Sequence, residues 1–184
     1  MKVSLAPATA ADAPALLELR EAFVREVGYH FGTKRREDGG WEVPVELRGT
    51  GEGLESYTVR VDGEAIGLVD LVRPGTGPGT LLNLFVAPEH RRRGIGSAAV
   101  GLVREEMVGD WLLRVPVGLP PAVGFVDDLV LQAGVGSLRE ASTESGPAGT
   151  LRTSLLRPGR SVPAPAPDKG GDGCFWFLLG GLLD

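Results

Sequence analysis

A short stretch near the middle of the chain carries arginines and glycines at the junction between an expected strand and an expected helix. An apolar run, Leu84–Val86, leads to Pro88, the triplet Arg91–Arg93 and two glycines, Gly94 and Gly96. Glycines at a helix start let a ligand approach backbone N–H groups that no side chain shields. Those donors and the positive end of the helix dipole favour phosphate groups, and nearby arginines add charge-assisted hydrogen bonds. The stretch therefore predicts a phosphorylated ligand held mostly by main chain.

Three other interpretations of this stretch explain less. The run Gly94–Ala99 also fits the dinucleotide fingerprint G-x-G-x-x-A, which needs its glycines directly after a strand. Here seven residues, Ala87–Arg93, intervene, and the next expected strand, Trp111–Val117, ends without the acidic residue that binds a ribose. A nucleic-acid patch at Arg91–Arg93 lacks interleaved aromatic residues and a second basic cluster. A proline turn without a ligand leaves the arginines and the paired glycines unexplained.

The composition indicates one globular domain and narrows its partners. The chain has 184 residues, of which 42% are hydrophobic and 23% charged, and its net charge is −5. That charge argues against a nucleic-acid partner and against an anionic membrane. The single cysteine, Cys174, excludes an internal disulfide and a cysteine cluster for a metal, so we expect no metal. The longest apolar run, 174–183, is too short to span a bilayer and no signal peptide is evident, which predicts a cytoplasmic protein.

Local patterns predict the elements that lead up to the arginine–glycine stretch. Val3–Leu5 is expected to form a strand, and a helix capped by Thr9 or Asp12 is expected to end at Gly28. The clearest signal is a hairpin, because Asp62-Gly63 favours a tight turn between two alternating apolar runs. Residues 29–55 are polar and glycine-rich, and their pattern leaves a short helix and a loop as alternatives. The strands expected before the stretch are Ser56–Val61, Ala65–Val72 and Leu81–Val86.

The chain after the stretch predicts further elements and then a change of character. Helices and strands are expected to alternate up to about residue 156, which favours an α/β domain over residues 1–158. Residues 159–184 are expected to form a flexible tail, with a Pro/Ala/Gly-rich linker over 161–173 and an apolar tip at 174–179. We favour an incidental terminus over docking of the tip on the domain or on a partner. The expected elements are a helix at Gly96–Val108, a strand at Trp111–Val117, a helix at Pro121–Ala133 and strands at Ser137–Ala141 and Thr150–Leu156.

The pattern Val86-x-Pro88-x-x-Arg91-x-x-Gly94-x-Gly96 resembles motif A of the GNAT superfamily, the acyl-CoA N-acyltransferases. The order of expected elements from residue 3 to about 156 is also similar to that superfamily. The resemblance implies an α/β (α+β) fold with a mixed, largely antiparallel central sheet flanked by helices. It also implies an N-acetyltransferase that moves an acetyl group, or another acyl group, from acetyl-CoA to a primary amine. The acceptor is then a small molecule or a protein, and a homodimer stays open.

The resemblance also implies which residues contact the acyl donor. Main-chain groups of Leu84, Phe85 and Val86 are expected to pair with the pantetheine arm, in effect adding a strand to the sheet edge. The amides from Arg92 through Ser97 are expected to cradle the pyrophosphate, with Arg91 at the first motif position and the other arginines near the ribose phosphate. The full expected set of donor-binding residues is Leu84, Phe85, Val86, Arg91, Arg92, Arg93, Gly94, Ile95, Gly96 and Ser97.

The catalytic part of the superfamily pattern is missing. Many members carry a tyrosine on the last helix, within Asn-x-x-Ala-x-x-Phe-Tyr, as the acid for the leaving thiolate. Here Phe125 is followed by Val126, a shifted register places Val130 at that position, and the asparagine is absent. Residues 80–83, where some members have a glutamate, contain no carboxylate. Solvent then has to supply the proton, and a non-catalytic acyl-CoA-binding sensor is an alternative function.

The remaining candidates for a general base or for the acceptor pocket each have a simpler explanation. Asp70 lies in an apolar strand, and a solvent-facing or edge position is favoured for it over a catalytic role. The other acids near the expected acceptor region fit surface charges, and the aromatic and histidine side chains there fit packing. We therefore assign no catalytic residue. The other candidates are Glu26, Glu42, Glu46, Tyr29, His30 and Trp41.

Overall fold

The computed structural model describes the domain in eight segments of the chain. These are residues 1–27, 35–40, 53–73, 76–106, 109–133, 138–146, 149–157 and 176–178. Several sequence expectations lie outside the described residues, namely most of the region 29–55, the helix-ending Gly28 and Gly134, and the linker 161–173.

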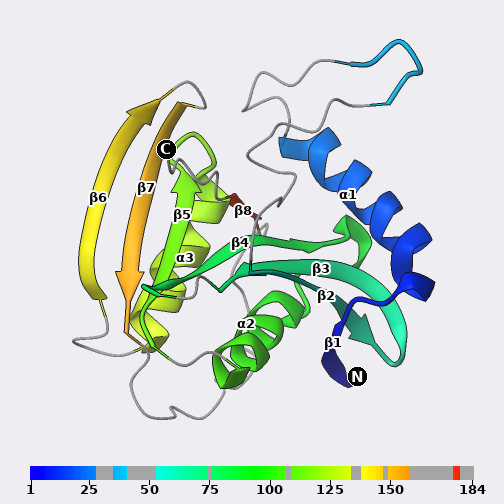
Figure 1. Ribbon diagram of the computed structural model, residues 1–184, viewed down its shortest axis with the longest axis horizontal. Helices are drawn as coiled ribbons and strands as arrows, with labels where there is room; N and C mark the ends of the chain where they lie inside the picture. The colour runs from blue at the N-terminus through cyan, green and yellow to red at the C-terminus, as the bar shows by residue number, and fades with distance from the viewer. Residues whose placement is uncertain are drawn as a thin grey trace.

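One mixed sheet organises the molecule (Figure 1). Its strands follow the order β1-β2-β3-β4-β5-β7-β6, and β8 pairs with β4 beside that path. Every pair is antiparallel except β4 with β5, which confirms the mixed, largely antiparallel sheet expected from the sequence. The strands are β1 (Val3–Pro7), β2 (Leu54–Val61), β3 (Glu64–Val72), β4 (Gly79–Val86), β5 (Trp111–Pro116), β6 (Leu138–Gly146), β7 (Gly149–Leu156) and β8 (Trp176–Leu178).

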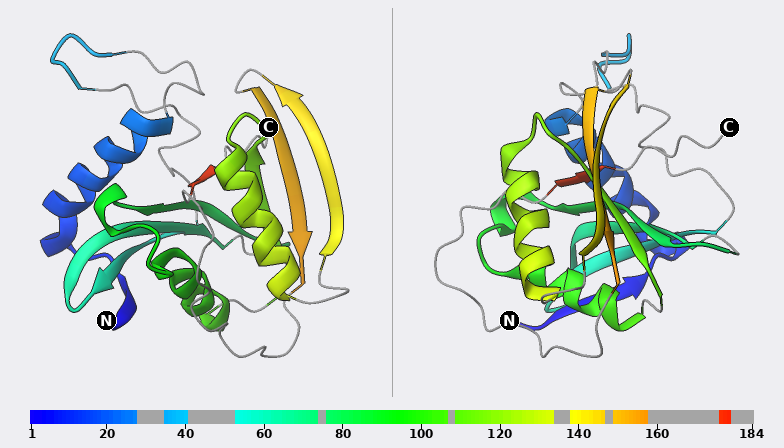
Figure 2. Two further views of the ribbon diagram at one scale, coloured as in Figure 1. Left: turned by 180° about the vertical axis from the view of Figure 1, so that it is seen from behind. Right: turned by 90° about the vertical axis from the view of Figure 1, so that its left-hand side faces the viewer.

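Three helices of the described residues cover the sheet. The helices α1 (Ala13–Val27) and α2 (Ile95–Glu106) lie on opposite sides of the β2–β4 part, and α3 (Pro120–Ala133) packs against β5 (Figures 1 and 2). Two short 3₁₀ turns, Ala10–Asp12 and Pro88–His90, precede α1 and α2. None of the described helices is long and apolar enough to cross a membrane.

The β2–β3 hairpin forms as its turn sequence predicts. Asp62 and Gly63 both have positive φ, of 50° and 95°, which is the backbone conformation of the two-residue turns that match strand twist. Asp62 also accepts a hydrogen bond from the Lys2 amide at its Oδ1, 3.1 Å away, and donates its own amide to the Lys2 carbonyl. The turn therefore fixes the start of β1 as well as the register of the hairpin.

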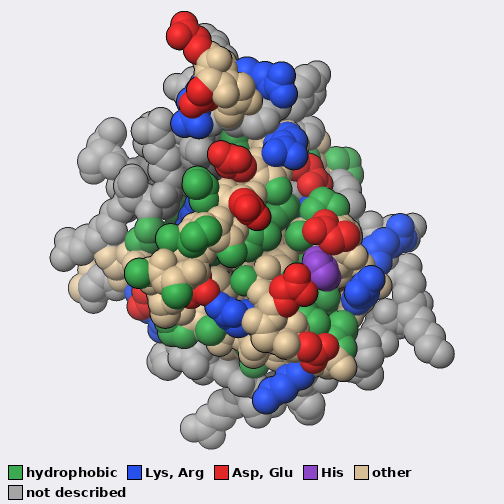
Figure 3. Space-filling model, turned by 90° about the vertical axis from the view of Figure 1, so that its right-hand side faces the viewer, with side chains coloured by type: hydrophobic (Ala, Val, Ile, Leu, Met, Phe, Trp, Pro, Cys, Tyr) green, Lys and Arg blue, Asp and Glu red, His purple; other side chains and the backbone are tan. Residues whose placement is uncertain are grey.

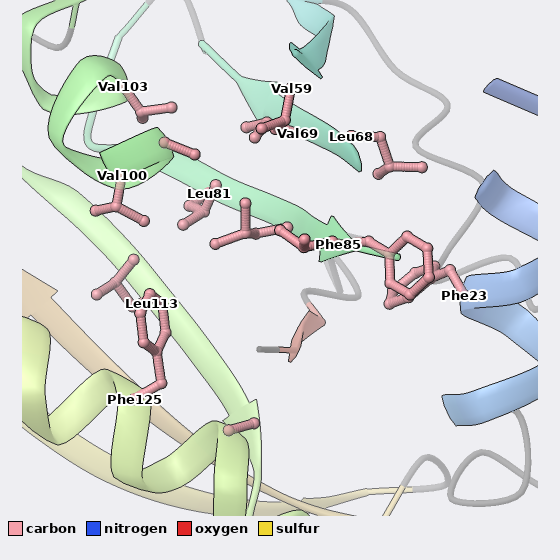
Figure 4. Packing of buried hydrophobic residues seen from close by; sticks show 14 of the residues in the cluster. Phe23, Val59, Leu68, Val69, Leu81, Phe85, Val100, Val103, Leu113 and Phe125 are labelled. Carbon is pink, nitrogen blue, oxygen red and sulfur yellow. The ribbon is translucent and has the colours of Figure 1, made fainter. Parts of the chain in front are cut away.

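The hydrophobic core continues through both halves of the sheet. Phe23 of α1 packs on Phe85 of β4 with ring centroids 5.7 Å apart, and both side chains are almost fully buried. Figure 4 shows this pair at one end of the cluster and Phe125 of α3 beside Leu113 of β5 at the other, with Leu81 of β4 between. On the outside, acidic and basic side chains alternate with apolar ones over the side nearest α1 (Figure 3). The strand β4 is contacted by α1, through Phe23 and Phe85, and by α2.

Asp12 caps the entry to α1. Its Oδ2 accepts hydrogen bonds from the Thr9 amide, at 2.8 Å, and from the Thr9 hydroxyl, at 2.7 Å. Its Oδ1 accepts a hydrogen bond from the Arg60 guanidinium of β2. The hydrogen bonds from Thr9, and then the charge of Arg60, lower the pKa of the Asp12 carboxyl below its ordinary value of 3.8. The carboxylate therefore joins the start of α1 to β2.

Asp12→Asn is expected to lower the melting temperature at neutral pH, and by less in acid. A carboxyl with a depressed folded-state pKa contributes stability that is complete above the unfolded pKa and is lost as the pH falls through the folded pKa. The gap between wild type and variant should therefore be constant from pH 7 to about pH 5 and close below the ordinary pKa. Thermal unfolding across this range tests the expectation, with Asp128→Asn on the exposed side of α3 as the control. A gap that persists at the acid end would show that the carboxylate charge is not its source.

Candidate functional site

The strands β4 and β5 pair only at their beginnings. The parallel ladder joins Gly79 to Trp111, Thr80 to Leu112 and Leu81 to Leu113, and then stops. From residue 82 onward β4 continues to Val86 with β3 on one edge. The other edge of β4 there has no partner in β5. Main-chain N–H and C=O groups on such an edge need hydrogen-bond partners, so this is where an extended ligand or another strand can add to the sheet.

The strand β8 takes up that edge in the structure. It runs antiparallel to β4 and aligns Leu178 with Asn83, Phe177 with Leu84 and Trp176 with Phe85. It also contacts β5 and α3, which places it between the two diverging strands (Figures 1 and 2). Of the two alternatives for the apolar tip, residues 176–178 therefore adopt the docked one, and the preference for an incidental terminus is wrong for them. The reason is that β4 offers an open edge, which the sequence of the tail does not reveal.

The turn from β4 to α2 directs backbone amides outward. Arg92 and Gly94 have φ of 60° and 73°, in the left-handed region that glycine adopts without strain and an arginine only under constraint. The helix begins at Ile95, and the Ala98 amide donates to the Gly94 carbonyl at 3.0 Å. By helix geometry the amides of Ile95, Gly96 and Ser97 precede any intrahelical partner and point out of the N-terminus. A helix end of this kind favours an anion, and the binding of a phosphate group here stays a prediction.

The three arginines of the motif differ in their surroundings. The Arg91 side chain is only 7% exposed, and its guanidinium donates two hydrogen bonds to Glu26 of α1, at 2.8 and 2.9 Å. Its Nε donates to the Val86 carbonyl at 2.7 Å, and its cationic group lies 5.4 Å from the Phe85 ring centre. Arg91 therefore ties α1 to the end of β4 and positions the turn. Arg92 and Arg93 are exposed, and their contact with a phosphorylated ligand stays a prediction.

Asp70 is the centre of a buried polar network, and the solvent-facing or edge position favoured for it is wrong. Its side chain is fully buried, because β3 is an interior strand covered by α1. Arg20 of α1 donates to both carboxylate oxygens, at 2.7 and 2.8 Å, and Ser56 of β2 donates to Oδ1 at 2.6 Å. Asn83 of β4 donates its Nδ2 to Oδ2 at 2.8 Å, while its own buried Oδ1 has no partner among the described residues. These four donors take up the acceptor sites of the carboxylate, which leaves little room for a hydrogen bond from a substrate.

The positions expected to hold a catalytic tyrosine are apolar in structure as well as in sequence. Val126, which follows the buried Phe125 in the chain, is itself fully buried in α3. Val130, one turn later, is half-buried. None of these side chains has a proton to give. Glu26, another candidate, is paired with Arg91. The candidates Tyr29, His30, Trp41, Glu42 and Glu46 lie outside the described residues.

Sequence reasoning missed Arg20, Ser56 and Asn83, which hold Asp70. A signal for them existed, because a carboxylate in an apolar strand needs a cation and several donors once it is buried. Arg20 lies one turn before Phe23 on the same side of α1. Phe23 packs on Phe85 of β4, so the Arg20 side chain faces the same side of the sheet and reaches Asp70. The pattern of α1 alone does not show which strand it faces.

A family model matches the part of the chain that contains this strand, turn and helix. The model described as the acetyltransferase (GNAT) family matches residues 16–126, more than half of the chain. The chain belongs to the GNAT acetyltransferase family. The match includes β4, the turn and all of α2. No curated protein matches this GNAT chain by sequence.

Solved structures with the same fold include other acetyltransferases. An acetyltransferase from Thermus thermophilus superposes with a TM-score of 0.61 at 20% identity, covering 86% of this chain and 97% of the other. The ribosomal-protein-S18-alanine N-acetyltransferase of Escherichia coli gives 0.59 at 16% identity, with coverage of 88% and 97%. A GNAT family acetyltransferase from Elizabethkingia anophelis, with acetyl-CoA bound, gives 0.51 at 12% identity, with coverage of 84% and 97%. At these identities the likeness establishes the fold.

Proposed function

We propose that this GNAT protein transfers an acetyl group from acetyl-CoA to a primary amine, and that residues 1–158 hold the catalytic unit. The observation that carries the proposal is that the β4 edge left unpaired by β5, on which β8 lies, leads to the N-terminus of α2. A strand edge can pair with an extended chain that carries amides, and a helix N-terminus can bind an anion. In an acyl-CoA the amide-containing pantetheine arm is followed by a pyrophosphate, so the molecule matches both features. A free nucleotide lacks the pantetheine arm and matches only the helix end.

The residues present fit the pyrophosphate. The amides of Ile95, Gly96 and Ser97 supply donors at the positive end of α2, and Arg92 and Arg93 bring two exposed positive charges to the same turn. Gly96 is buried within the helix start, and it adds no side chain between those amides and a ligand. On this proposal Arg91 acts through the turn that it holds, because its guanidinium is engaged by Glu26 and Val86.

The chain contributes mainly position and polarisation to the reaction. A neutral amine attacks the thioester carbonyl, so a C–N bond forms, the C–S bond breaks, and the amine loses a proton to solvent. On this proposal a main-chain N–H of the Leu84–Val86 segment donates to the developing oxyanion. The thiolate takes its proton from solvent, because Val126 and Val130 have none to offer. Rate acceleration then rests on holding the amine and thioester together.

The net charge of the chain indicates a broad class of acceptor. The net charge of −5 favours a basic amine over an acidic one, since opposite charge steers encounter. Both a protein amino group, as the name of the E. coli relative implies for that enzyme, and a small polyamine-like molecule satisfy this condition. The proposal is limited to the class of basic primary amines.

Free-thiol release tests the proposed reaction. The full-length protein is incubated with acetyl-CoA and a panel of primary amines that includes peptides, polyamines and aminoglycosides. We expect thiol release above the no-protein control for at least one basic amine, with an equal amount of acetylated product by mass spectrometry. Tight binding of coenzyme A without release for any amine would contradict the enzymatic proposal.

That second outcome corresponds to an alternative function, a non-catalytic acyl-CoA-binding sensor. Two observations favour it: Asp70 is occupied by four donors, and apolar side chains stand at the tyrosine positions of α3. A sensor needs the donor site alone. The thiol assay and a coenzyme A titration on the same sample therefore separate the two functions.

A further inference from the structure

The strand β8 lies on the part of β4 that the proposed function gives to the acyl donor. Its partners on β4 are Asn83, Leu84 and Phe85. The pantetheine arm is expected to pair with the main chain of Leu84, Phe85 and Val86, so two of these three residues are shared. A strand edge offers each main-chain group one partner at a time. The two occupants therefore exclude each other.

We propose that β8 is an autoinhibitory strand that competes with acyl-CoA for the open edge of β4. This inference rests on the proposed donor site. It adds that the apparent affinity for coenzyme A is set by two equilibria, one for release of β8 and one for binding of the donor. The tail of this chain is thereby a regulatory element, and anything that sequesters residues 176–178 activates the protein.

The length of the strand suits a reversible contact. Three residues make few ladder hydrogen bonds, and a pair this short has little stability of its own. The chain connects β8 to the end of β7 through residues 157–175, which keeps the strand close to its site after release. A short tether gives an effective concentration on the order of 1 mM. Docking about 90% of the time would weaken donor binding about ten-fold.

Proline substitutions in the full chain test the competition. Phe177→Pro and Leu178→Pro together remove two neighbouring amide donors, and one of any two neighbours in a strand faces the β4 edge. The matched control, Gly170→Pro with Gly171→Pro, places the same change in the tail away from β8. Calorimetric titration with coenzyme A gives the Kd of wild type and both variants. We expect the β8 variant to bind about ten-fold more tightly than wild type and the control to bind like wild type.

Each other outcome overturns a defined part of the inference. Equal Kd values for all three proteins would rule out autoinhibition by β8 without contradicting the proposed donor site. Failure of all three to bind coenzyme A would overturn the donor site, and the inference with it.

Hydrogen exchange on the wild-type protein gives a second readout that needs no variant. Without ligand, amides on the pairing side of residues 176–178 should be protected. Saturating coenzyme A should expose them while the β4 amides at 83–85 stay protected. Continued protection of residues 176–178 at saturation would show that β8 and the donor do not compete.

Discussion

Gly96→Glu is expected to weaken coenzyme A binding by about 100-fold or more, since placing like charges together costs several kcal/mol and 1.4 kcal/mol is ten-fold. The substitution puts a carboxylate beside the amides of α2 that are proposed to face the pyrophosphate. The same charge near a helix N-terminus is favourable for the helix itself. Gly96 is buried, so the added side chain also has a cost in stability, and the Kd is determined for the folded fraction of each variant.

Two matched variants identify the cause of that loss. Gly96→Gln adds similar bulk without the charge and should lose less affinity than Gly96→Glu. Gly101→Glu carries the charge further along α2, where a Cβ would meet nothing within 4 Å, and should bind like wild type. Calorimetry with coenzyme A measures all three. A wild-type Kd for Gly96→Glu would place the pyrophosphate away from this helix end and overturn the proposed donor site.

The parts of the fold with local signals could be predicted closely from the sequence. The Asp62-Gly63 turn fixes its hairpin because the required backbone conformation belongs to those residue types. The expected helix Gly96–Val108 and the observed α2, Ile95–Glu106, differ at their ends by one or two residues. The motif itself could be assigned because its glycines, proline and arginines act through main chain and charge within a dozen residues.

The parts that depend on distant partners could not be predicted. Asp70 looks like a surface or edge residue from its own strand, and its burial depends on Arg20, fifty residues earlier on a helix. The motif predicts that Arg91 contacts the ligand, whereas in the structure its guanidinium donates to Glu26 of α1. The docking of β8 depends on the divergence of β4 from β5, which is a property of the sheet as a whole. In each case the local pattern indicates that a partner is needed without indicating where it lies.

The network around Asp70 leads to the second large effect, on stability. Removing one partner of a buried ion pair leaves the other charge uncompensated, which destabilises proteins by about 3–5 kcal/mol. Asp70 is fully buried and Arg20 is 27% exposed, so water relieves part of the penalty on the arginine. Asp70→Ala is therefore expected to lower the free energy of unfolding by about 3 kcal/mol, near the lower end of that range. Urea unfolding measures it, with the exposed Asp128→Ala as a control that should stay within about 0.5 kcal/mol of wild type.

A double-variant cycle then separates the pair from the rest of the network. Arg20→Met removes the cation and should also destabilise, because Asp70 stays buried with only Ser56 and Asn83 as donors. Arg20→Met with Asp70→Leu removes both charges, and it should lose less than the sum of the single variants, since replacing a buried pair by apolar residues is often close to neutral. Additive losses would show that the two residues stabilise the protein independently.

A further variant, Asp70→Asn, decides whether Asp70 acts in catalysis. A general base acts on the reaction rate per folded molecule, whereas a residue that joins α1 to β3 and β4 acts on the folded fraction. Asp70→Asn keeps the shape of the side chain and removes its negative charge. We expect it to release thiol at nearly the wild-type rate once the rate is divided by the folded fraction. A fall of 100-fold or more in that corrected rate, with coenzyme A affinity unchanged, is the scale of effect that loss of a general base produces, and it would make Asp70 a catalytic residue despite its four donors.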